Sequence, residues 1–498
     1  LPLAEPVPAL AFDTASSPAI QPGTNERTFA VLNFGCKANA WDGQALRERL
    51  HAAGLAETDP DNPVSAPPDV LVLNSCTVTD TADREALAVL RKMRRRFPAA
   101  QIVATGCMAD ISPAEMLAAA HSSTARPSLL LPTADKLDIL ARLGLQLPAG
   151  TASPVPASAP IDGSIARFEH RSRAFVKIQD GCDLCCAFCI IPQARGMPRS
   201  RTPEAIAAEV LALDQAGYRE IVLTGIHLGA YGKDFAPDAY FPGSNSAKRG
   251  PNLVAELLER LLALPIRARF RISSLEVTEL SDHLLDLMAG HPDRLCPHLH
   301  LPLQAGDDAI LKAMRRWYTT AEFTSAVDRY RRKIPTGALS TDVIVGFPAE
   351  TDTSFARTMD YIRQIGFSRL HVFPYSPRKK TVASRLPGQR PWRERKQRAA
   401  YLRQIGIELS QAYHQSFVGR EATVVLEPSP PVRSGTVTHH PSTTTFAGYT
   451  EQYIPVRVTA PTAWLRRLAR VKLGAALPET AADHVAPALA AEPLELLY

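Results

Sequence analysis

Four cysteines lie close together in residues 181–192, GCDLCCAFCIIP, and two sets of metal ligands are compatible with their spacing. Read as Cys182-x2-Cys185 followed by Cys186-x2-Cys189, the segment holds the two CxxC pairs of a zinc site. Read as Cys182-x3-Cys186-x2-Cys189, it supplies three thiolates and leaves Cys185 over. The two pairs abut without a spacer, so one zinc ion would have to be wrapped by eight consecutive residues. The spacing therefore favours the three-thiolate arrangement.

Three further cysteines follow three predicted strands. Cys36 comes after TFAVLNFG, Cys76 after DVLVLNS and Cys107 after QIVATG. Because the carboxyl ends of parallel strands share one edge of a sheet, we expect these cysteines to meet there. A single free cysteine is usually a small buried apolar residue, but three at equivalent strand ends predict a metal site. Three thiolates without a nearby histidine fit an iron–sulfur cluster with one open iron better than closed tetrahedral zinc.

The elements that position these cysteines alternate between apolar runs and helical patterns. This alternation predicts an α/β protein with an open parallel α/β domain, then a partial (βα)6 barrel with about six units, then short β-rich runs that form a small antiparallel β-barrel. The expected boundaries are a disordered extension (1–27), the first domain (28–145), a linker (146–166), the partial barrel (167–400) with a loop insertion (235–252), the β-barrel (401–462), and a C-terminal extension of helix and disorder (463–498).

The charge of the chain is unevenly distributed. The 498 residues carry a net charge of +6, yet residues 378–403 hold ten Lys/Arg against only Glu394, and residues 91–96 add five more. These stretches sum to +14, so the remainder is about −8 (6 − 14), and we predict a localised polyanion-binding surface, with solvated helix faces as the alternative. The sequence shows no secretory signal and no apolar run of membrane length, so we expect a cytoplasmic protein with reduced thiols and no membrane partner.

The CxxxCxxC pattern of residues 182–189, with Phe188 before its last cysteine, resembles the radical S-adenosylmethionine (radical SAM) enzymes. The resemblance implies that Cys182, Cys186 and Cys189 hold a [4Fe–4S] cluster, whose open iron binds SAM and whose reduced form cleaves it to a 5′-deoxyadenosyl radical. It also implies contacts to SAM from Phe188 and from the strand ends of the barrel, namely Thr224, Gly225, Ser274, Glu276, Gln304, Ile344, Gly346 and Pro348.

Two three-cysteine sites followed by a small β-barrel resemble the methylthiotransferase family specifically. The resemblance rests on FGCKANAWD (34–42), NSCTVTDTADRE (74–85), ATGCMAD (104–110), DGCDLCCAFCIIPQARG (180–196) and LHLPLQAGDDAILKAMRRWYT (299–319). It implies that Cys36, Cys76 and Cys107 hold a second, auxiliary [4Fe–4S] cluster that supplies sulfur, that a second SAM supplies the methyl group, and that the last domain is an RNA-binding TRAM domain.

Three segments, GCK (35–37), VLTGIHLGAYG and GYTEQYI (448–454), resemble the branch of this family that acts on N6-threonylcarbamoyladenosine at tRNA position 37. The implied partners are a tRNA anticodon stem-loop with a flipped-out adenosine, a reductant such as flavodoxin or ferredoxin, and a sulfur donor that the sequence does not identify. The alternatives are a methylthiotransferase acting on isopentenyladenosine in tRNA or on a ribosomal-protein aspartate, and, outside enzymes, a zinc-stabilised RNA-binding protein.

Overall fold

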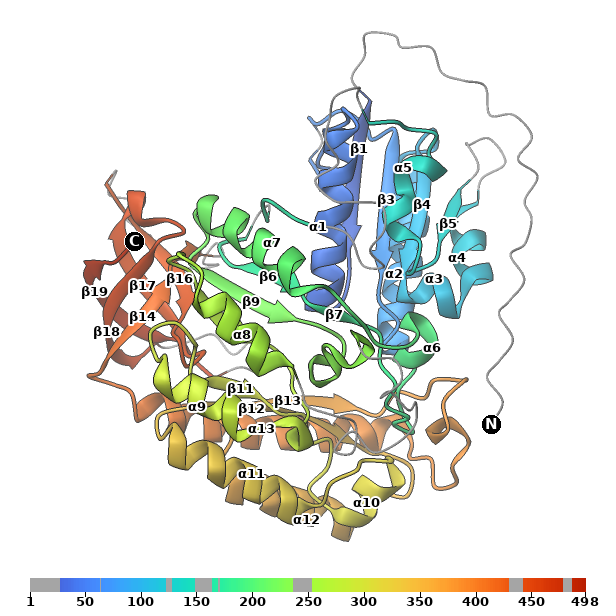
Figure 1. The fold of residues 1–498 in the computed structure, drawn as a ribbon. Helices are drawn as coiled ribbons and strands as arrows, with labels where there is room; N and C mark the ends of the chain where they lie inside the picture. The colour runs from blue at the N-terminus through green and yellow to red at the C-terminus, as the bar shows by residue number, and fades with distance from the viewer. Residues whose placement is uncertain are drawn as a thin grey trace.

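Three folded parts follow one another along the chain (Figure 1). The computed structural model describes residues 27–62, 64–121, 128–147, 164–168, 171–235, 253–429, 442–477 and 486–498. The predicted N-terminal extension, most of the linker and nearly all of the 235–252 insertion lie outside these residues. Within the described ranges, no helix combines the length and the apolar character needed to cross a bilayer.

The N-terminal domain is the predicted open parallel sheet, with strand order β2-β1-β3-β4-β5. Alternate residues of the central strand β3 enter opposite cores: Leu71 and Leu73 face α2 and α4, whereas Val70 and Val72 face α1 and α5. The domain consists of β1 (Thr28–Asn33), α1 (Lys37–Ala52), β2 (Ala56–Glu57), β3 (Val70–Ser75), α2 (Asp80–Arg96), β4 (Gln101–Gly106), α3 (Cys107–Ile111), α4 (Pro113–Ala120), β5 (Leu129–Leu131) and α5 (Ile139–Arg142).

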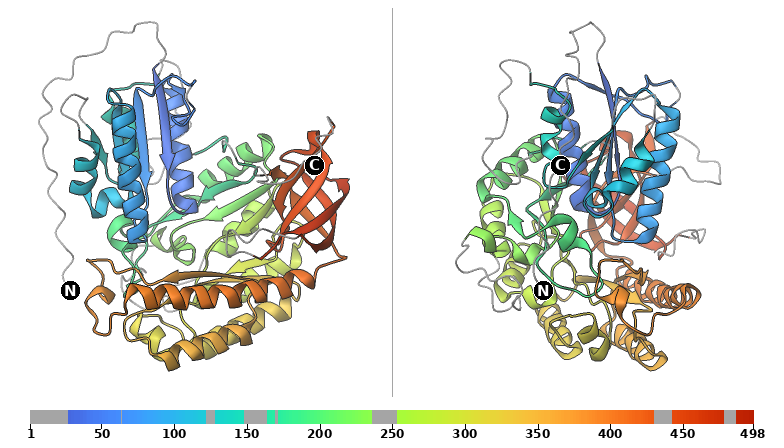
Figure 2. Two further views of the ribbon diagram at one scale, coloured as in Figure 1. Left: turned by 180° about the vertical axis from the view of Figure 1, so that it is seen from behind. Right: turned by 90° about the vertical axis from the view of Figure 1, so that its right-hand side faces the viewer.

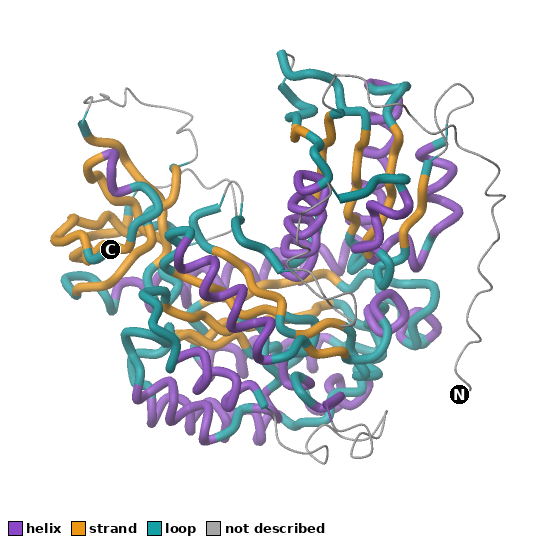
Figure 3. The backbone as a smooth tube through the Cα atoms, turned by 45° about the horizontal axis from the view of Figure 1, so that its top comes forward, coloured by secondary structure: helices purple, strands orange, loops and turns teal. Residues whose placement is uncertain are grey.

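The central domain is the predicted partial barrel. Two parallel sheets, β10-β9-β6 and β11-β12-β13, are joined by bridges between Phe270 and Leu295 and between Ser274 and His300, which gives six parallel strands. Helices cover their outer side (Figures 2 and 3). The strands are β6 (Ala174–Lys177), β9 (Glu220–Thr224), β10 (Arg269–Ile272), β11 (His298–His300), β12 (Ala338–Val345) and β13 (Arg369–Pro374). The helices are α6 (Ile191–Arg195), α7 (Pro203–Gln215), α8 (Val254–Leu262), α9 (Asp282–Gly290), α10 (Asp308–Ala313), α11 (Thr320–Lys333), α12 (Asp352–Ile365) and α13 (Trp392–Gln415), with a short β7–β8 pair (Gln179–Asp180, Arg199–Ser200) beside the barrel.

The C-terminal domain is a curled six-stranded sheet with the order β14-β18-β19-β17-β16-β15. Its first and last strands are almost continuous in sequence, and a bridge between Val424 and Thr450 draws the two edges together. All pairs are antiparallel, as predicted, except β17 with β19. The strands are β14 (Glu421–Val425), β15 (Glu427–Pro428), β16 (Thr443–Tyr449), β17 (Pro455–Pro461), β18 (Leu468–Ala476) and β19 (Leu489–Leu496).

Two predicted boundaries are wrong. The residues assigned to a C-terminal extension (463–498) supply β18 and β19, and in β18 the buried Ala469, Val471 and Leu473 alternate with exposed charged residues, which is the period of a strand rather than a helix. The boundary at residue 400 cuts through α13. That helix packs on β13 and buries Leu402 and Ile405 in the core of the barrel, so it belongs to the central domain.

The C-terminal domain docks on the amino ends of the barrel strands. Glu220, the first residue of β9, accepts hydrogen bonds from Arg269 Nε (2.9 Å) and Arg271 Nε (2.8 Å). Burial alone would raise the pKa of Glu220, but the two arginines hold it well below its usual range. Arg271 also donates to the carbonyl oxygens of Thr450 and Glu451, each at 3.0 Å. Buried, fully paired charges therefore tie this domain to the end of the barrel opposite the cysteines.

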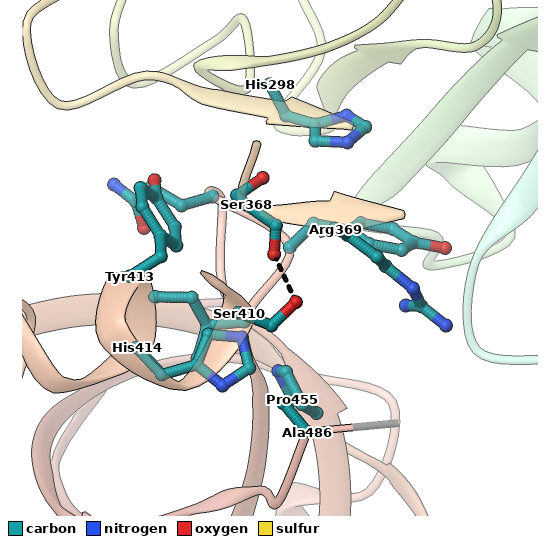
Figure 4. Close-up of a pocket in the computed structure, with 11 residues that line it drawn as sticks. His298, Ser368, Arg369, Ser410, Tyr413, His414, Pro455 and Ala486 are labelled. Atoms are coloured by element: carbon teal, nitrogen blue, oxygen red, sulfur yellow. Dashed lines mark hydrogen bonds between the residues drawn. The ribbon is translucent and has the colours of Figure 1, made fainter. Parts of the chain in front are cut away.

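A small pocket lies at this junction (Figure 4), lined by the ends of β11 and α13 and by the C-terminal domain. Ser410 Oγ donates to the carbonyl oxygen of Ser368 at 2.8 Å across it. His414, in the last turn of α13, is buried beside it, and burial lowers the pKa of this imidazole to about 4. The fold therefore holds His414 neutral at neutral pH.

Acidification is expected to weaken this junction. The folded-state pKa of His414 lies below its ordinary value of 6.5, so the unfolded chain binds more protons and stability falls as pH drops from 6.5 towards 4. Between pH 7.5 and pH 5, His414 should account for a loss of about 2 kcal/mol. Calorimetry should show a smaller acid-induced drop of the unfolding midpoint in His414→Gln than in the unmodified chain. The exposed control His283→Gln should keep the full drop; equal drops in all three proteins would contradict the prediction.

Candidate active site

The three N-terminal cysteines meet at the carboxyl edge of their sheet. Cys36 caps α1, Cys76 directly follows β3, and Cys107 directly follows β4 as the first residue of α3. Burial raises the pKa of the Cys76 thiol to about 11, and the neighbouring Cys107 and Cys36 raise it further. Gly35 lets the chain approach, because a Cβ there would lie 2.7 Å from the Cβ of Cys76. A bound cation would be needed to hold these three cysteines as thiolates.

The second cluster of cysteines lies on the loop between β7 and α6. Cys189 N donates to the carbonyl oxygen of Cys186 at 3.1 Å, which closes a turn around the site. Burial raises the pKa of Cys189, and the charges of Cys186 and Cys182 raise it further. Cys185 differs from these three. It is exposed, and its thiol donates to the carbonyl oxygen of Asp183 at 3.7 Å. The loop thus gathers one triad and turns Cys185 outward.

A different donor set also meets at this loop. Cys182, Asp183 and His227 are the three potential ligands that the described residues bring within 4.8 Å of one another. His227 Nε2 lies 2.8 Å from Glu279 Oε1, and Nδ1 lies 3.4 Å from Asp183 Oδ1. Burial alone would lower the pKa of His227, but the Glu279 carboxylate outweighs it and raises the pKa well above its usual value. These contacts hold the His227 ring beside Cys182 and Asp183, so His227 supports the cysteine loop.

Arg316 connects the second triad to one predicted SAM contact. Its Nη1 donates to Cys186 Sγ at 3.2 Å, and its Nη2 pairs with the Glu276 carboxylate. The guanidinium is buried, and although burial disfavours its charge, Glu276 raises the pKa of Arg316 well above its ordinary value. A permanent cation therefore sits between Glu276 and Cys186, where it could neutralise a carboxylate or a thiolate ligand.

The other predicted SAM contacts lie at or beyond the carboxyl ends of the barrel strands. Gln304 adopts a left-handed backbone (φ 67°), and its N donates to the carbonyl oxygen of Asp342, while Ile344 N donates back to Gln304. Gly346 instead packs against Arg395 of α13. Phe188 lies on the cysteine loop itself, Thr224 and Gly225 at the end of β9, Ser274 and Glu276 after β10, and Ile344 to Pro348 at the end of β12.

A second arginine reaches from the central domain to the N-terminal triad. Arg195, at the end of α6, donates from Nε to Cys107 Sγ at 3.2 Å. Sequence reasoning missed Arg195, Arg316 and His227, although each lies inside a segment that carries the family resemblance. No local sequence pattern could single them out, because their partners are distant in the chain.

The predicted polyanion-binding surface is only partly available. Arg378 is buried and donates to Thr77 Oγ1 (2.6 Å) and Asp83 Oδ2 (2.5 Å), which fixes the N-terminal domain to the barrel. Arg398 is likewise buried and pairs with Glu350. Such arginines satisfy internal acceptors and cannot bind phosphates. Half of the ten basic residues of 378–403 remain exposed, namely Lys379, Lys380, Arg385, Arg393 and Lys396, together with Arg91, Lys92, Arg95 and Arg96 of α2.

Two family models match the parts of the chain that hold the two triads. The Radical SAM superfamily matches residues 176–362, and Uncharacterized protein family UPF0004 matches residues 28–125. Together with the parallel half-barrel and its CxxxCxxC loop, the first match defines a radical SAM protein.

Similar proteins extend the match along most of the chain. The chain is 33% identical to a Threonylcarbamoyladenosine tRNA methylthiotransferase MtaB of Bacillus subtilis, over 90% of this chain and 93% of that protein. It is 34% identical to the MtaB of Thermotoga maritima, over 80% and 87%. It is also 34% identical to tRNA-2-methylthio-N(6)-dimethylallyladenosine synthase 1 of Mycobacterium marinum, over 83% and 76%. The chain belongs to the radical SAM methylthiotransferases, and its cofactors are SAM and two [4Fe–4S] clusters.

Proposed function

We propose that this protein converts N6-threonylcarbamoyladenosine at tRNA position 37 into its 2-methylthio derivative, with Cys182, Cys186 and Cys189 holding the radical SAM cluster and Cys36, Cys76 and Cys107 holding the auxiliary cluster. In this reaction the C2–H bond of the adenine gives way to C2–SCH₃. The hydrogen leaves in 5′-deoxyadenosine, the methyl group comes from a second SAM, the sulfur comes from the auxiliary site, and electrons come from a reductant such as flavodoxin or ferredoxin. The names of the relatives support both this substrate and the dimethylallyl one.

Lys37 is the observation that favours the threonylcarbamoyl substrate. It is exposed as the first residue of α1, directly after Cys36, and it forms no ion pair with the acidic residues of the described ranges. The threonylcarbamoyl group ends in a carboxylate, whereas the dimethylallyl group is an uncharged hydrocarbon. An unpaired ammonium beside the sulfur-donating site therefore suits the first substrate.

Lys37 lies within electrostatic range of a polar cluster on strands of the barrel, formed by His300, Asp342 and His371. His300 Nε2 lies 3.3 Å from Asp342 Oδ1, and the rings of His300 and His371 meet edge to face at 5.6 Å. Burial would raise the pKa of Asp342, but the hydrogen bond and charge of His300, with the charges of His371 and Lys37, hold it below its usual range. This cluster offers donors and an acceptor for the amide and hydroxyl groups of a threonylcarbamoyl substituent, while Lys37 meets its carboxylate.

The remaining groups have supporting roles in this proposal. Arg316 with Glu276 would orient the SAM bound beside Cys186, and Phe188 would lie near its adenine. The exposed basic residues of α2 and of 378–403 would hold the phosphates of the anticodon stem-loop, and the C-terminal domain would add contacts to the RNA as a TRAM-like domain.

Mass spectrometry of tRNA nucleosides tests the substrate. In cells that lack their own methylthiotransferases, the unmodified chain should produce 2-methylthio-N6-threonylcarbamoyladenosine. Lys37→Gln should lower kcat/KM for this substrate about 10- to 100-fold, the loss expected for one charge-assisted contact, and Lys37→Arg should retain most of it.

The dimethylallyl substrate provides the internal control. If Lys37→Gln impairs both substrates equally, Lys37 does not recognise the carboxylate. If the unmodified chain methylthiolates only dimethylallyladenosine, or only a ribosomal-protein aspartate, the proposed substrate is wrong.

A further inference from the structure

The side chain of Arg195 is fully buried where the N-terminal and central domains meet. Its Nη1 donates to both oxygens of Asp180, at 2.7 and 2.9 Å, and its Nη2 donates to Asp42 Oδ2 at 3.1 Å and to Asn39. Nε is left to donate to Cys107 Sγ at 3.2 Å. The carboxylates of Asp180 and Asp42 thus fix the orientation of the Arg195 guanidinium, and its Nε–H points at the thiol of Cys107 in the N-terminal domain.

The surrounding network carries an excess of positive charge. Asp42 of the N-terminal domain also pairs with Lys136 Nζ (2.7 Å) and Lys177 Nζ (2.5 Å), and Lys177 pairs with Asp180 (2.9 Å). Each carboxylate pairs with at least two of these cationic side chains: Asp42 with all three, and Asp180 with Arg195 and Lys177. Three cations against two carboxylates leave a formal charge of 3 − 2 = +1. A net buried charge is costly unless a counter-charge lies beside it.

A three-thiolate [4Fe–4S] cluster supplies such a counter-charge. An oxidised cubane core carries 2+, and three cysteinate ligands bring the total to −1. Cys107 is the ligand that touches the network. A hydrogen bond to a ligand sulfur withdraws electron density from it, which favours the reduced cluster and raises its reduction potential.

We propose that Arg195 of the central domain is a positioning residue for the auxiliary cluster of the N-terminal domain: it donates a hydrogen bond to Cys107 Sγ and supplies the positive charge that offsets the charge of the cluster. The inference rests on the assignment of Cys36, Cys76 and Cys107 to that cluster and goes beyond the proposed reaction. It makes the redox properties of a site in one domain depend on a side chain of the other.

The test uses the full chain with Cys182, Cys186 and Cys189 replaced by alanine, so that only the auxiliary cluster can form. Iron and sulfide are assayed after anaerobic reconstitution, and the reduction potential is measured by a redox titration followed by electron paramagnetic resonance. At a fixed potential, Arg195→Gln should lower the reduced-to-oxidised ratio about tenfold, which is a shift of about 59 mV to more negative potential for a one-electron couple. The reduction potential of Arg195→Lys should lie between those of the unmodified side chain and Arg195→Gln, because lysine keeps the positive charge but loses the planar donor.

Arg201 offers a matched control at the same domain junction. It is equally buried, pairs with Glu209 (2.7 Å) and lies over the ring of Trp41 from the N-terminal domain, but it touches no cysteine. Arg201→Gln should leave the potential of the auxiliary cluster unchanged. If Arg195→Gln fails to load the cluster while Arg201→Gln loads it, the positioning role is also supported.

Two results would overturn the inference: an unchanged potential in Arg195→Gln with a fully loaded cluster, or equal effects of Arg195→Gln and Arg201→Gln on potential or on loading. Failure of the assigned site itself looks different. If the chain with intact Arg195 binds no iron in the triple-alanine background, the cysteine assignment is wrong. Neither readout involves tRNA, so the identity of the nucleoside substrate does not affect the outcome.

Discussion

Alanine in place of Cys182, Cys186 or Cys189 is expected to abolish reductive cleavage of SAM, whereas Cys185→Ala should retain it within about twofold, as for a surface substitution. Cys182 is buried and Cys186 and Cys189 are partly buried, and in the proposed assignment each is needed to leave a single iron open for SAM. Cys185 is exposed and bonds only to a neighbouring carbonyl oxygen. The measurement is 5′-deoxyadenosine formed from SAM with a chemical reductant, together with iron and labile sulfide.

Cys185→Ala is the matched control for this prediction, because it removes a thiol from the same loop. Iron retained in Cys186→Ala but lost in Cys185→Ala would show that the ligands are a different triad. Zinc without labile sulfide in the anaerobically prepared chain would favour the zinc-stabilised RNA-binding alternative.

Substitution at the N-terminal triad should separate the two halves of the chemistry. Cys36→Ala, Cys76→Ala or Cys107→Ala is expected to lose about half of the bound iron and to reduce the methylthiolated nucleoside to background, while 5′-deoxyadenosine is still formed. The reason is spatial. The N-terminal cysteines follow strands of a separate sheet, and the CxxxCxxC loop is built entirely from the central domain.

The decisive comparison is the ratio of methylthiolated nucleoside to 5′-deoxyadenosine in each variant. Cys296→Ala provides the control, since this buried cysteine lies in neither triad. Methylthiolation at the normal level by Cys107→Ala would exclude the N-terminal site as the sulfur source. Loss of SAM cleavage as well would show that the two sites are not separable.

The cysteine geometry could be predicted from sequence because it follows from local pattern. Buried apolar runs mark the strands, and the first residues after β3 and β4 necessarily lie on one edge of a parallel sheet. The same logic places the loop of residues 182–189 at the carboxyl end of the barrel. Short-range periodicity suffices when function depends on where a strand ends.

Contacts between residues that are distant in the chain could not be predicted from the sequence in this way. Arg195 and Cys107 are 88 residues apart, and Arg378 and Thr77 are 301 residues apart, so nothing local distinguishes these buried arginines from exposed ones. This is why three of the fifteen basic residues in the two stretches, Arg94, Arg378 and Arg398, turned out to be buried. The helix predicted after residue 462 is also wrong, because this segment forms β18, which pairs with β14 and β19.

The charge network around Arg195 also bears on how the protein moves. Moving the N-terminal domain away from the barrel would separate Asp42 from Lys177 and Arg195. It would also expose Trp41, whose Nε1 donates a hydrogen bond to Glu209 at 2.8 Å. Breaking several buried pairs at once carries a free-energy cost of several kcal/mol, so the arrangement with the two domains in contact dominates. The domain contact then sets the separation between the two cysteine triads, and a substrate that reacts at both has to fit that preset distance.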